Sequence, residues 1–343
     1  MTGNHKIAVV NWLYSGLFLV VAMVVIGGIT RLTGSGLSMV EWQVISGAIP
    51  PLNAEEWEKA FDAYKQFPEY QKMNYHLTLS GFKGIFWWEY SHRLAGRITG
   101  LVFIIPFIYF LWKKRLSKLE IKNLIFILFL GILQGAMGWF MVKSGLINNP
   151  HVSHFRLAAH LSLALLLIGS IQWLILKIKY PDLKGLICWE TIRFPLATLC
   201  LLLIFIQVVL GAFVAGLKSG YYHNTFPLMN SQLIPWDSFA RGDLWDNGSF
   251  VQFLHRWFAW IVFGVVVATW LKIRTGYCTL RVRKYSNYLM LMALVQVILG
   301  ISTLILAVPL SLGVAHQITA VILFSLSLTL LYHVRHCGEF AFT

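Results

Sequence analysis

Long apolar stretches alternate with shorter polar segments along the whole chain. A helix that crosses the hydrocarbon layer of a bilayer, about 30 Å thick, needs roughly 20 mostly apolar residues. The pattern contains eight such stretches and predicts an all-α integral membrane protein with eight transmembrane helices. They cover residues 9–29, 91–112, 124–142, 155–176, 194–217, 250–271, 288–308 and 313–333.

The composition agrees with this prediction, because 57% of the residues are hydrophobic and only 12% are charged. A soluble domain of this size could not cover that apolar content with a polar surface. The net charge of +14 would fit a nucleic-acid partner, but the basic residues collect in alternate connections between the spans. These residues are Lys113, Lys114, Arg115, Lys118 and Lys122, then Lys177, Lys179, Lys184 and Arg193, then Lys272, Arg274, Arg281, Arg283 and Lys284. Lys and Arg favour cytoplasmic loops, so we expect these connections and both termini in the cytoplasm, and no nucleic-acid partner.

The N-terminus and the cysteines indicate a bacterial-type inner membrane. Residues 1–6 run into the first span without a small-residue cleavage site or an Arg- and Ser-rich transit region. The cysteines fall on or near the predicted cytoplasmic side, where thiols stay reduced, so we expect no disulfide or zinc site. They are Cys188, Cys200, Cys278 and Cys337.

An internal repeat divides the chain into two four-helix halves, residues 1–180 and 181–343. Four pairs of anchors match in order, and the predicted fold is therefore two pseudo-symmetric four-helix bundles. The pairs are 25–28 (VIGG) with 209–212 (VLGA), His92-Arg93 with His255-Arg256, Gln134 and Gly138 with Gln296 and Gly300, and Ala159-His160 with Ala315-His316. The second, fourth, sixth and eighth spans run from outside to inside, which places all four histidines at similar depth near the outer surface.

These histidines are the main candidates for chemistry, because a histidine inside a membrane is costly and usually functional. The alternative role is a hydrogen bond between helices. Here His92 and His160 form one pair and His255 and His316 a second. Two imidazoles from neighbouring helices are what six-coordinate haem iron needs, whereas no third ligand repeats as zinc would require.

Arginines near the histidines could bind the haem propionates bidentately. They are Arg93, Arg97, Arg156 and Arg256. The alternative is that they extend to the outer lipid headgroups. We expect Gln134 and Gln296 to be interhelical hydrogen-bond partners.

The two halves differ three residues before the first histidine of each pair. Glu89 precedes His92, whereas Gln252 precedes His255. One helical turn places each side chain on the same face as its histidine. A carboxylate beside a haem edge can move protons, orient water or stabilise a developing cation, and a neutral bis-histidine site suits electron transfer. The first half is therefore expected to be catalytic and the second an electron relay, with a salt bridge to Arg93 as the alternative role of Glu89.

The predicted outer loop 31–90 is long enough to be functional. Within it Trp57, Phe61 and Tyr64 recur at helical spacing, after Asn53 as a possible cap with Glu56 three residues later. This pattern predicts an amphipathic helix, which either lies on the outer bilayer face or is a solvated loop helix packed on the other outer loop. The remaining outer histidines show no repeat and are expected at the surface. They are His76, His151, His154 and His223. His223 is a weak exception to this expectation.

Several long, ordered motifs cover nearly the whole chain. They are 27–39 (GGITRLTGSGLSM), 89–93 (EYSHR) with Gly96-Arg97, 215–221 (AGLKSGY), 224–229 (NTFPLM), 252–256 (QFLHR) and His316-Gln317. In these motifs the chain resembles the haem A synthases of cytochrome oxidase assembly. Its first outer loop has no cysteine pair, which resembles the branch of that family that lacks one there.

The resemblance implies that the C8 methyl group of haem O is oxidised through the alcohol to a formyl group, giving haem A. It implies that Glu89, His92 and His160 handle the substrate, with the two histidines on its iron. It makes His255 and His316 the axial ligands of a bound haem b. It also implies haem O synthase as a partner that delivers the substrate, and a homo-oligomer as in relatives.

Two other functions fit the residues. A bis-histidine diheme membrane cytochrome for electron transfer would need no Glu89. A transporter with parallel repeats would place its path between the halves, but transporters usually break helices at mid-membrane, and the histidines here are predicted near the outer surface.

Overall fold

The computed structural model describes residues 3–40, 46–145, 152–180, 193–239, 243–276 and 278–335. In these residues the regular secondary structure is helical, apart from an isolated bridge between Met229 and Gln232. Eight of the described helices are long and apolar enough to cross a membrane, which confirms the predicted fold class. They are α1 (Gly3–Leu32), α3 (Leu79–Trp112), α4 (Lys118–Gly145), α5 (His154–Lys179), α6 (Arg193–Gly216), α8 (Gly248–Arg274), α9 (Leu280–Ile305) and α10 (Leu310–Arg335).

The short elements lie in two of the connections. Between α1 and α3 they are η1 (Ser46–Ala48), α2 (Ala54–Lys65) and η2 (Tyr70–Asn74). Between α6 and α8 they are η4 (Ser219–Tyr221), α7 (Trp236–Phe239) and η5 (Leu244–Asp246). The chain forms two compact units, one of Met1–Leu17 with Leu165–Thr343 and the other of Phe18–Ala164.

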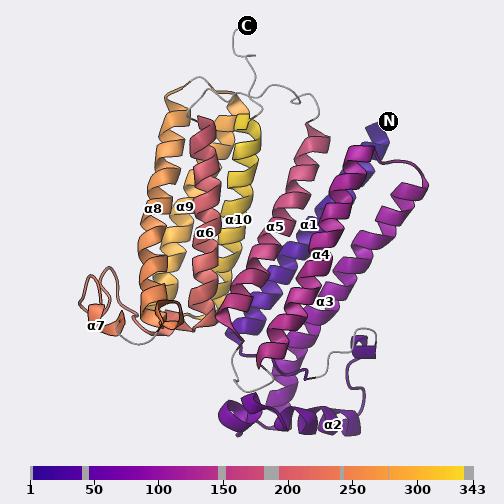
Figure 1. Ribbon diagram of the computed structural model, residues 1–343, viewed down its shortest axis with the longest axis vertical. Coiled ribbons are helices and arrows are strands. Elements are labelled where there is room, and N and C mark those ends of the chain that lie inside the picture. The colour runs from indigo at the N-terminus through magenta and orange to yellow at the C-terminus, as the bar shows by residue number, and fades with distance from the viewer. Residues whose placement is uncertain are drawn as a thin grey trace. The chain divides into compact units, whose positions relative to one another are not determined.

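In the first of these units α6, α8, α9 and α10 stand side by side as a four-helix bundle (Figure 1). The C-terminal half of α5 packs against α10, where Gln172 Nε2 donates hydrogen bonds to Ser325 O at 2.7 Å and Thr329 Oγ1 at 2.6 Å. Nearby, the rings of Trp173 and Tyr332 meet edge to face with centroids 5.0 Å apart. Because these hydrogen bonds lie inside an otherwise apolar contact, they fix the register of α5 against α10.

The α8 and α9 helices begin at polar caps, as the sequence at their N-termini favours. The Asn247 side chain accepts a hydrogen bond from Phe250 N, and the Thr279 side chain accepts one from Val282 N. These bonds satisfy amide groups that the first turn of a helix leaves without a partner. The cap at Asn247 places His255 two turns inside α8 rather than at its start.

In the other unit α3 begins at Leu79, twelve residues before the predicted start at residue 91. Residues 79–90 of the predicted outer loop 31–90 are thus helical. At about 1.5 Å per residue, 34 residues extend roughly 50 Å, well beyond a hydrocarbon layer of about 30 Å. The extra turns carry the buried side chains Phe82, Phe86 and Tyr90, which gives them a protein neighbour instead of lipid.

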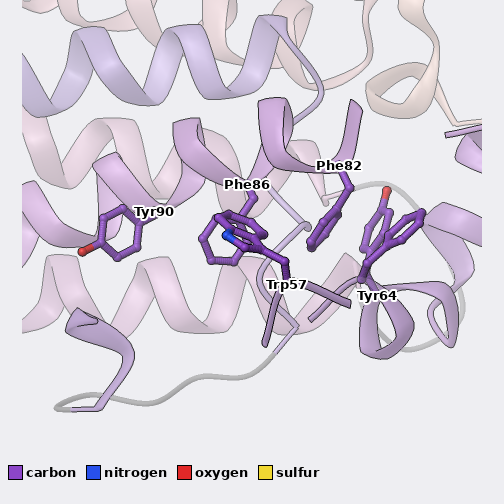
Figure 2. Packing of buried hydrophobic residues seen from close by; sticks show 6 residues of the cluster. Trp57, Tyr64, Phe82, Phe86 and Tyr90 are labelled. Carbon is purple, nitrogen blue, oxygen red and sulfur yellow. The ribbon is translucent and has the colours of Figure 1, made fainter. Parts of the chain in front are cut away.

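That neighbour is α2, whose residues Trp57, Phe61 and Tyr64 pack on the α3 extension (Figure 2). The α2 cap is as predicted, since Glu56 N donates to Asn53 Oδ1 at 2.9 Å. The predicted helix is confirmed, but its apolar face is buried against α3 and is not available to lipid. Neither predicted environment is the observed one, because this face packs on the N-terminal turns of α3 rather than on the bilayer or on the other outer loop.

Candidate functional site

Each of the four predicted histidines faces a glycine on the long helix that precedes its own. A Cβ atom added at the glycine would lie 3.1 Å from His92 Nε2, 3.3 Å from His160 Cε1, 3.2 Å from His255 Cε1 or 2.9 Å from His316 Cε1. The glycines are, in the same order, Gly27, Gly138, Gly211 and Gly300. A Cβ atom at any of these positions would press against the imidazole, most strongly at Gly300, so glycine permits the close approach. The four contacts repeat in both halves of the sequence.

The pair in α8 and α10 has the geometry of two ligands on one metal. The ring centroids of His255 and His316 are 6.4 Å apart and the ring planes are inclined by 80°. A ligating nitrogen lies about 2 Å from a bound metal and about 1 Å from its ring centre, so rings on opposite sides of one iron have centroids about 6 Å apart. The observed separation matches that value, so His255 and His316 are the residues of this unit that would hold a haem iron.

The pair in α3 and α5 belongs to the other unit. The imidazoles of His92 and His160 are close enough to interact electrostatically. His92 makes a hydrogen bond with the backbone of Met23 in α1. His160 instead contacts the side chain of Gln134 in α4, with Gln134 Nε2 at 3.3 Å from His160 Nε2. The structure therefore brings each predicted pair together within one unit.

Glutamines contact both imidazoles of the α8–α10 pair. Gln207 Nε2 lies 3.1 Å from His255 Nδ1 and donates to His255 O at 2.9 Å. Gln296 Nε2 lies 3.2 Å from His316 Nδ1 and donates to His316 O at 3.1 Å. The predicted role of Gln134 and Gln296 as interhelical hydrogen-bond partners is confirmed, and their partners are the histidines themselves.

Glu89 lies at the centre of a buried polar cluster and is only 3% exposed. Its carboxylate accepts hydrogen bonds from Ser38 Oγ at 2.7 Å and Met39 N at 2.9 Å. It also forms an ion pair with Arg93 at 2.6 Å, and Arg93 Nη2 donates to Met39 O at 2.8 Å. These three partners hold the carboxylate in a fixed position. The salt bridge predicted as the alternative role of Glu89 is therefore present.

The equivalent position in α8 is neutral and has different neighbours. Gln252 Nε2 donates to His223 O at 3.3 Å. His223 is 7% exposed, and its Nε2 pairs with Ser249 Oγ at 3.0 Å. Burial lowers the pKa of His223, and the nearby charge of Arg256 lowers that pKa further, which keeps the ring neutral. The two halves thus differ in charge at this position, as the sequence predicts.

The predicted arginines make different contacts. Arg256 Nη2 donates to the carbonyl oxygens of Thr225 at 2.8 Å and Pro227 at 3.0 Å, while its Nη1 is buried and has no hydrogen-bond partner in the described residues. That unused donor fits a carboxylate ligand such as a propionate. Arg156 donates to Phe140 O at 2.9 Å and covers the ring of the same residue. Arg97 is half-buried one turn beyond Arg93.

The predicted surface histidines divide into three groups. His76 is exposed as expected. His154 and His223 are buried, so the prediction for these two is wrong, and for His223 the reason is that segment 219–228 folds back over the start of α8. His151 lies outside the described residues.

The structure also reveals site residues that the sequence reading missed. Gln207 is one, although its spacing of four residues before Gly211 repeats that of Gln134 and Gln296 before their glycines. Ser38 and Met39 are two more, and they belong to the 27–39 motif without any feature that would pair them with Glu89. Contacts across 50 residues of chain require the fold.

The chain is similar to proteins of one known family. The sequence profile of the family described as cytochrome oxidase assembly protein matches residues 10–328. The chain is 46% identical to haem A synthase of Nitrosospira multiformis over 330 residues, covering 94% of this chain and 92% of that protein. It is 45% identical to haem A synthase of Flavobacterium psychrophilum over 328 residues (93% and 96%) and 40% identical to that of Rickettsia africae over 332 residues (94% and 96%). With a family match across nearly its whole length, the chain belongs to the cytochrome oxidase assembly protein family.

Proposed function

We propose that this protein is a haem A synthase, a membrane oxidoreductase that converts the C8 methyl group of haem O to a formyl group. The observation that carries the proposal is the His255–His316 pair, whose ring separation of 6.4 Å matches two ligands on one haem iron. Relatives at 40–46% identity over nearly the whole chain carry the name haem A synthase. Haem chemistry and family membership therefore support the same activity.

His255 and His316 are assigned to a bound haem b that relays electrons. The neutral Gln252 beside them supports a relay, because an amide at that position cannot take up or release a proton as a carboxylate can. Arg256 supports the same assignment, since its buried Nη1 is available for a propionate. We place this site in the C-terminal half, residues 181–343.

His92 and His160 are assigned to the iron of the substrate haem O, in the N-terminal half formed by residues 1–180. Arg93 and Arg97 lie on the same helix as His92 and are proposed to face its propionates. Arg93 already uses its Nη2 for the ion pair with Glu89, so a propionate would have to be bound by its other guanidinium nitrogens.

Glu89 is proposed to stabilise positive charge that develops on the haem edge as the methyl group is oxidised. A buried carboxylate with fixed donors acts as a pre-oriented charge and needs no reorganisation during the reaction. Its contacts with Ser38, Met39 and Arg93 hold the side chain in one orientation, which suits this role.

The natural context follows from the proposed reaction. We infer an inner-membrane location with both termini in the cytoplasm, because the basic residues gather in alternate connections. A haem O synthase is the proposed source of the very apolar substrate, and assembly of several copies into a homo-oligomer is proposed from the resemblance.

The test is haem extraction and chromatography from membranes that contain this protein together with a haem O synthase. The wild type should yield haem A and haem b, whereas His92→Ala should accumulate haem O and keep haem b. A wild type that yields only haem b and unchanged haem O would contradict the synthase and favour a diheme electron-transfer cytochrome. An absence of all haem would contradict both functions.

A further inference from the structure

Two arginines and an asparagine line a cavity of about 140 Å³ at one end of the α8–α9 pair. Arg274 is the last residue of α8, and Arg283 and Asn287 lie near the start of α9. One water molecule needs roughly 10–15 Å³ of such volume, so a phosphate group with its four oxygens fits. At about 1.5 Å per residue, Arg274 lies roughly 28 Å along α8 from His255, so the cavity is separate from the histidine pair.

The contacts that hold these side chains leave hydrogen-bond donors toward the cavity. Trp270 Nε1 donates to Asn287 Oδ1 at 2.8 Å, so the acceptor of this amide is used and its Nδ2 donor remains. Arg283 Nη2 donates to Gly276 O at 3.3 Å. Arg274 lies over the Trp270 ring, 5.2 Å from its centroid. Because a guanidinium carries five N–H donors, both arginines can still bind an anion.

The chain places no carboxylate near this pair of arginines in the sequence. Residues 247–338 contain neither Asp nor Glu. None of the ion pairs in the described ranges involves Arg274 or Arg283. Two guanidinium groups beside one cavity repel each other, and an anion bound between them removes that repulsion. Phosphate is the anion that the planar arginine fork matches best after a carboxylate.

An apolar stripe continues from the cavity along α9. Leu291, Leu294 and Ile298 follow Asn287 at intervals of four, three and four residues, so they lie on the same face of the helix. All three side chains are exposed in the protein. Donors at the end of a spanning helix, followed by apolar surface toward its middle, match a molecule with a phosphate head and hydrocarbon chains. A soluble phosphate would make no use of the stripe.

We propose that Arg274, Arg283 and Asn287 bind the phosphate of an anionic phospholipid, whose acyl chains lie along the apolar stripe of α9. A zwitterionic lipid fits less well, because its ammonium group would be repelled by the two guanidinium groups. In the orientation proposed above, this end of the helices faces the cytoplasm, where anionic lipids attract Lys and Arg. The lipid site is independent of the proposed haem chemistry.

Lipid binding to the purified, delipidated full-length protein tests the proposal. The protein in detergent is titrated with phosphatidylglycerol or phosphatidylethanolamine of identical acyl chains, and native mass spectrometry counts the bound lipids. The wild type should bind phosphatidylglycerol more tightly than phosphatidylethanolamine. Arg283→Gln and Arg274→Gln should each weaken phosphatidylglycerol binding roughly 10-fold or more, because each loses a charge-assisted hydrogen bond.

The matched control is Lys284→Gln, which removes the same charge from the neighbouring position of α9. Lys284 does not line the cavity, and its Nζ lies 5.7 Å from the centroid of the Tyr288 ring. Its variant should keep the wild-type affinity for phosphatidylglycerol. An equal loss in Arg283→Gln and Lys284→Gln would overturn the proposal, since it indicates a diffuse attraction to positive charge rather than a site.

Two further outcomes would overturn the lipid assignment. Equal affinity of the wild type for the two lipids is one. The other is release of phosphatidylglycerol by an equal concentration of inorganic phosphate, which would indicate a site for soluble phosphate. A melting curve of each variant checks folding, and if Arg283→Gln does not fold, Arg274→Gln on the other helix decides. Haem A formation enters none of these measurements, so failure of the lipid site and failure of the proposed function are distinguishable.

Discussion

Glu89 and Gln252 occupy equivalent positions, three residues before a histidine in α3 and α8, yet their surroundings differ in kind. Glu89 is an anion bound by Ser38, Met39 and Arg93. Gln252 makes a neutral hydrogen bond to a loop carbonyl. A buried ion pair of this type adds little net stability, but removal of one partner leaves an uncompensated charge and costs about 3–5 kcal/mol. The pair is better explained by the negative charge of Glu89 beside the proposed substrate site.

Glu89→Gln should separate the charge from the shape of this side chain. The amide oxygen can still accept the hydrogen bonds from Ser38 and Met39, but Arg93 loses its anionic partner, so the stability of the fold should fall by about 3–5 kcal/mol. Haem b in the other unit should remain bound and shows that the variant is folded. Loss of the negative charge should lower haem A formation by roughly 100-fold or more, as removal of other electrostatic contacts to transition states does. Haem extraction gives the yield of haem A relative to haem b.

The matched control is Glu56→Gln, which alters an exposed carboxylate that receives a hydrogen bond from Leu52 N near the start of α2. It should form haem A at the wild-type rate. Wild-type turnover in the Glu89 variant would remove Glu89 from the mechanism and leave the salt bridge as its whole role.

Gly300→Ala should displace a haem b ligand. The new Cβ would lie 2.9 Å from His316 Cε1, a distance at which the ring must move. Overpacking of this kind costs about 1–3 kcal/mol, so haem b should bind roughly 10-fold to 100-fold more weakly. The haem b content per protein after detergent purification measures the effect.

Gly264→Ala in α8 is the control for this glycine, because its Cβ would meet no atom within 4 Å. Alanine is a better helix former than glycine, so this variant should keep its haem and gain slightly in stability. Equal haem b content in the two variants would show that the close approach of Gly300 to the imidazole is not required.

At the scale of elements, the apolar pattern located the spanning helices well and misplaced the start of α3. Residues 79–90 mix apolar side chains with Ser80, Lys83 and Glu89, so this segment is less apolar than residues 91–112. What makes them helical is a capping residue, Thr78, and the apolar positions Phe82, Phe86 and Tyr90 at intervals of four. Their partner is α2, and no pattern within α3 predicts that partner.

Trp57→Ala should loosen this contact between α2 and α3. Trp57 is buried and its ring centroid lies 4.9 Å from that of Phe86, so truncation should cost about 3 kcal/mol or more. An energy of that size makes local opening roughly 100-fold more frequent. Limited proteolysis of the full-length protein should then cut segment 46–78 correspondingly faster.

Lys59→Ala serves as its control, since the ion pair of Lys59 with Glu55 is largely exposed and worth little. It should leave the cleavage rate unchanged. If Trp57→Ala is cleaved no faster than the wild type, α2 is held by contacts other than the aromatic cluster.

At the scale of the whole molecule, the repeat in the sequence predicted the two histidine pairs, and the structure adds the glycine that faces each one. Polar residues inside apolar spans are rare, so their recurrence at matched positions was visible without a fold. Gln207 was missed because the equivalent position in the first half, four residues before Gly27, is Met23, so the repeat does not mark it. Ser38 and Met39 could not be found because their role depends on where a loop returns to α3.

Membrane orientation is the property of the whole molecule that still rests on the basic residues. We expect the connection between α8 and α9 in the cytoplasm and α2 on the opposite side. The native Cys278, which is partly exposed, should therefore resist a membrane-impermeant maleimide in intact cells and react after lysis. A cysteine introduced by Glu58→Cys, on the exposed side of α2, should react in intact cells. An odd number of spans separates α2 from Cys278, so the two sites must lie on opposite sides of the membrane. The reverse labelling would place the histidine pairs near the cytoplasmic surface instead.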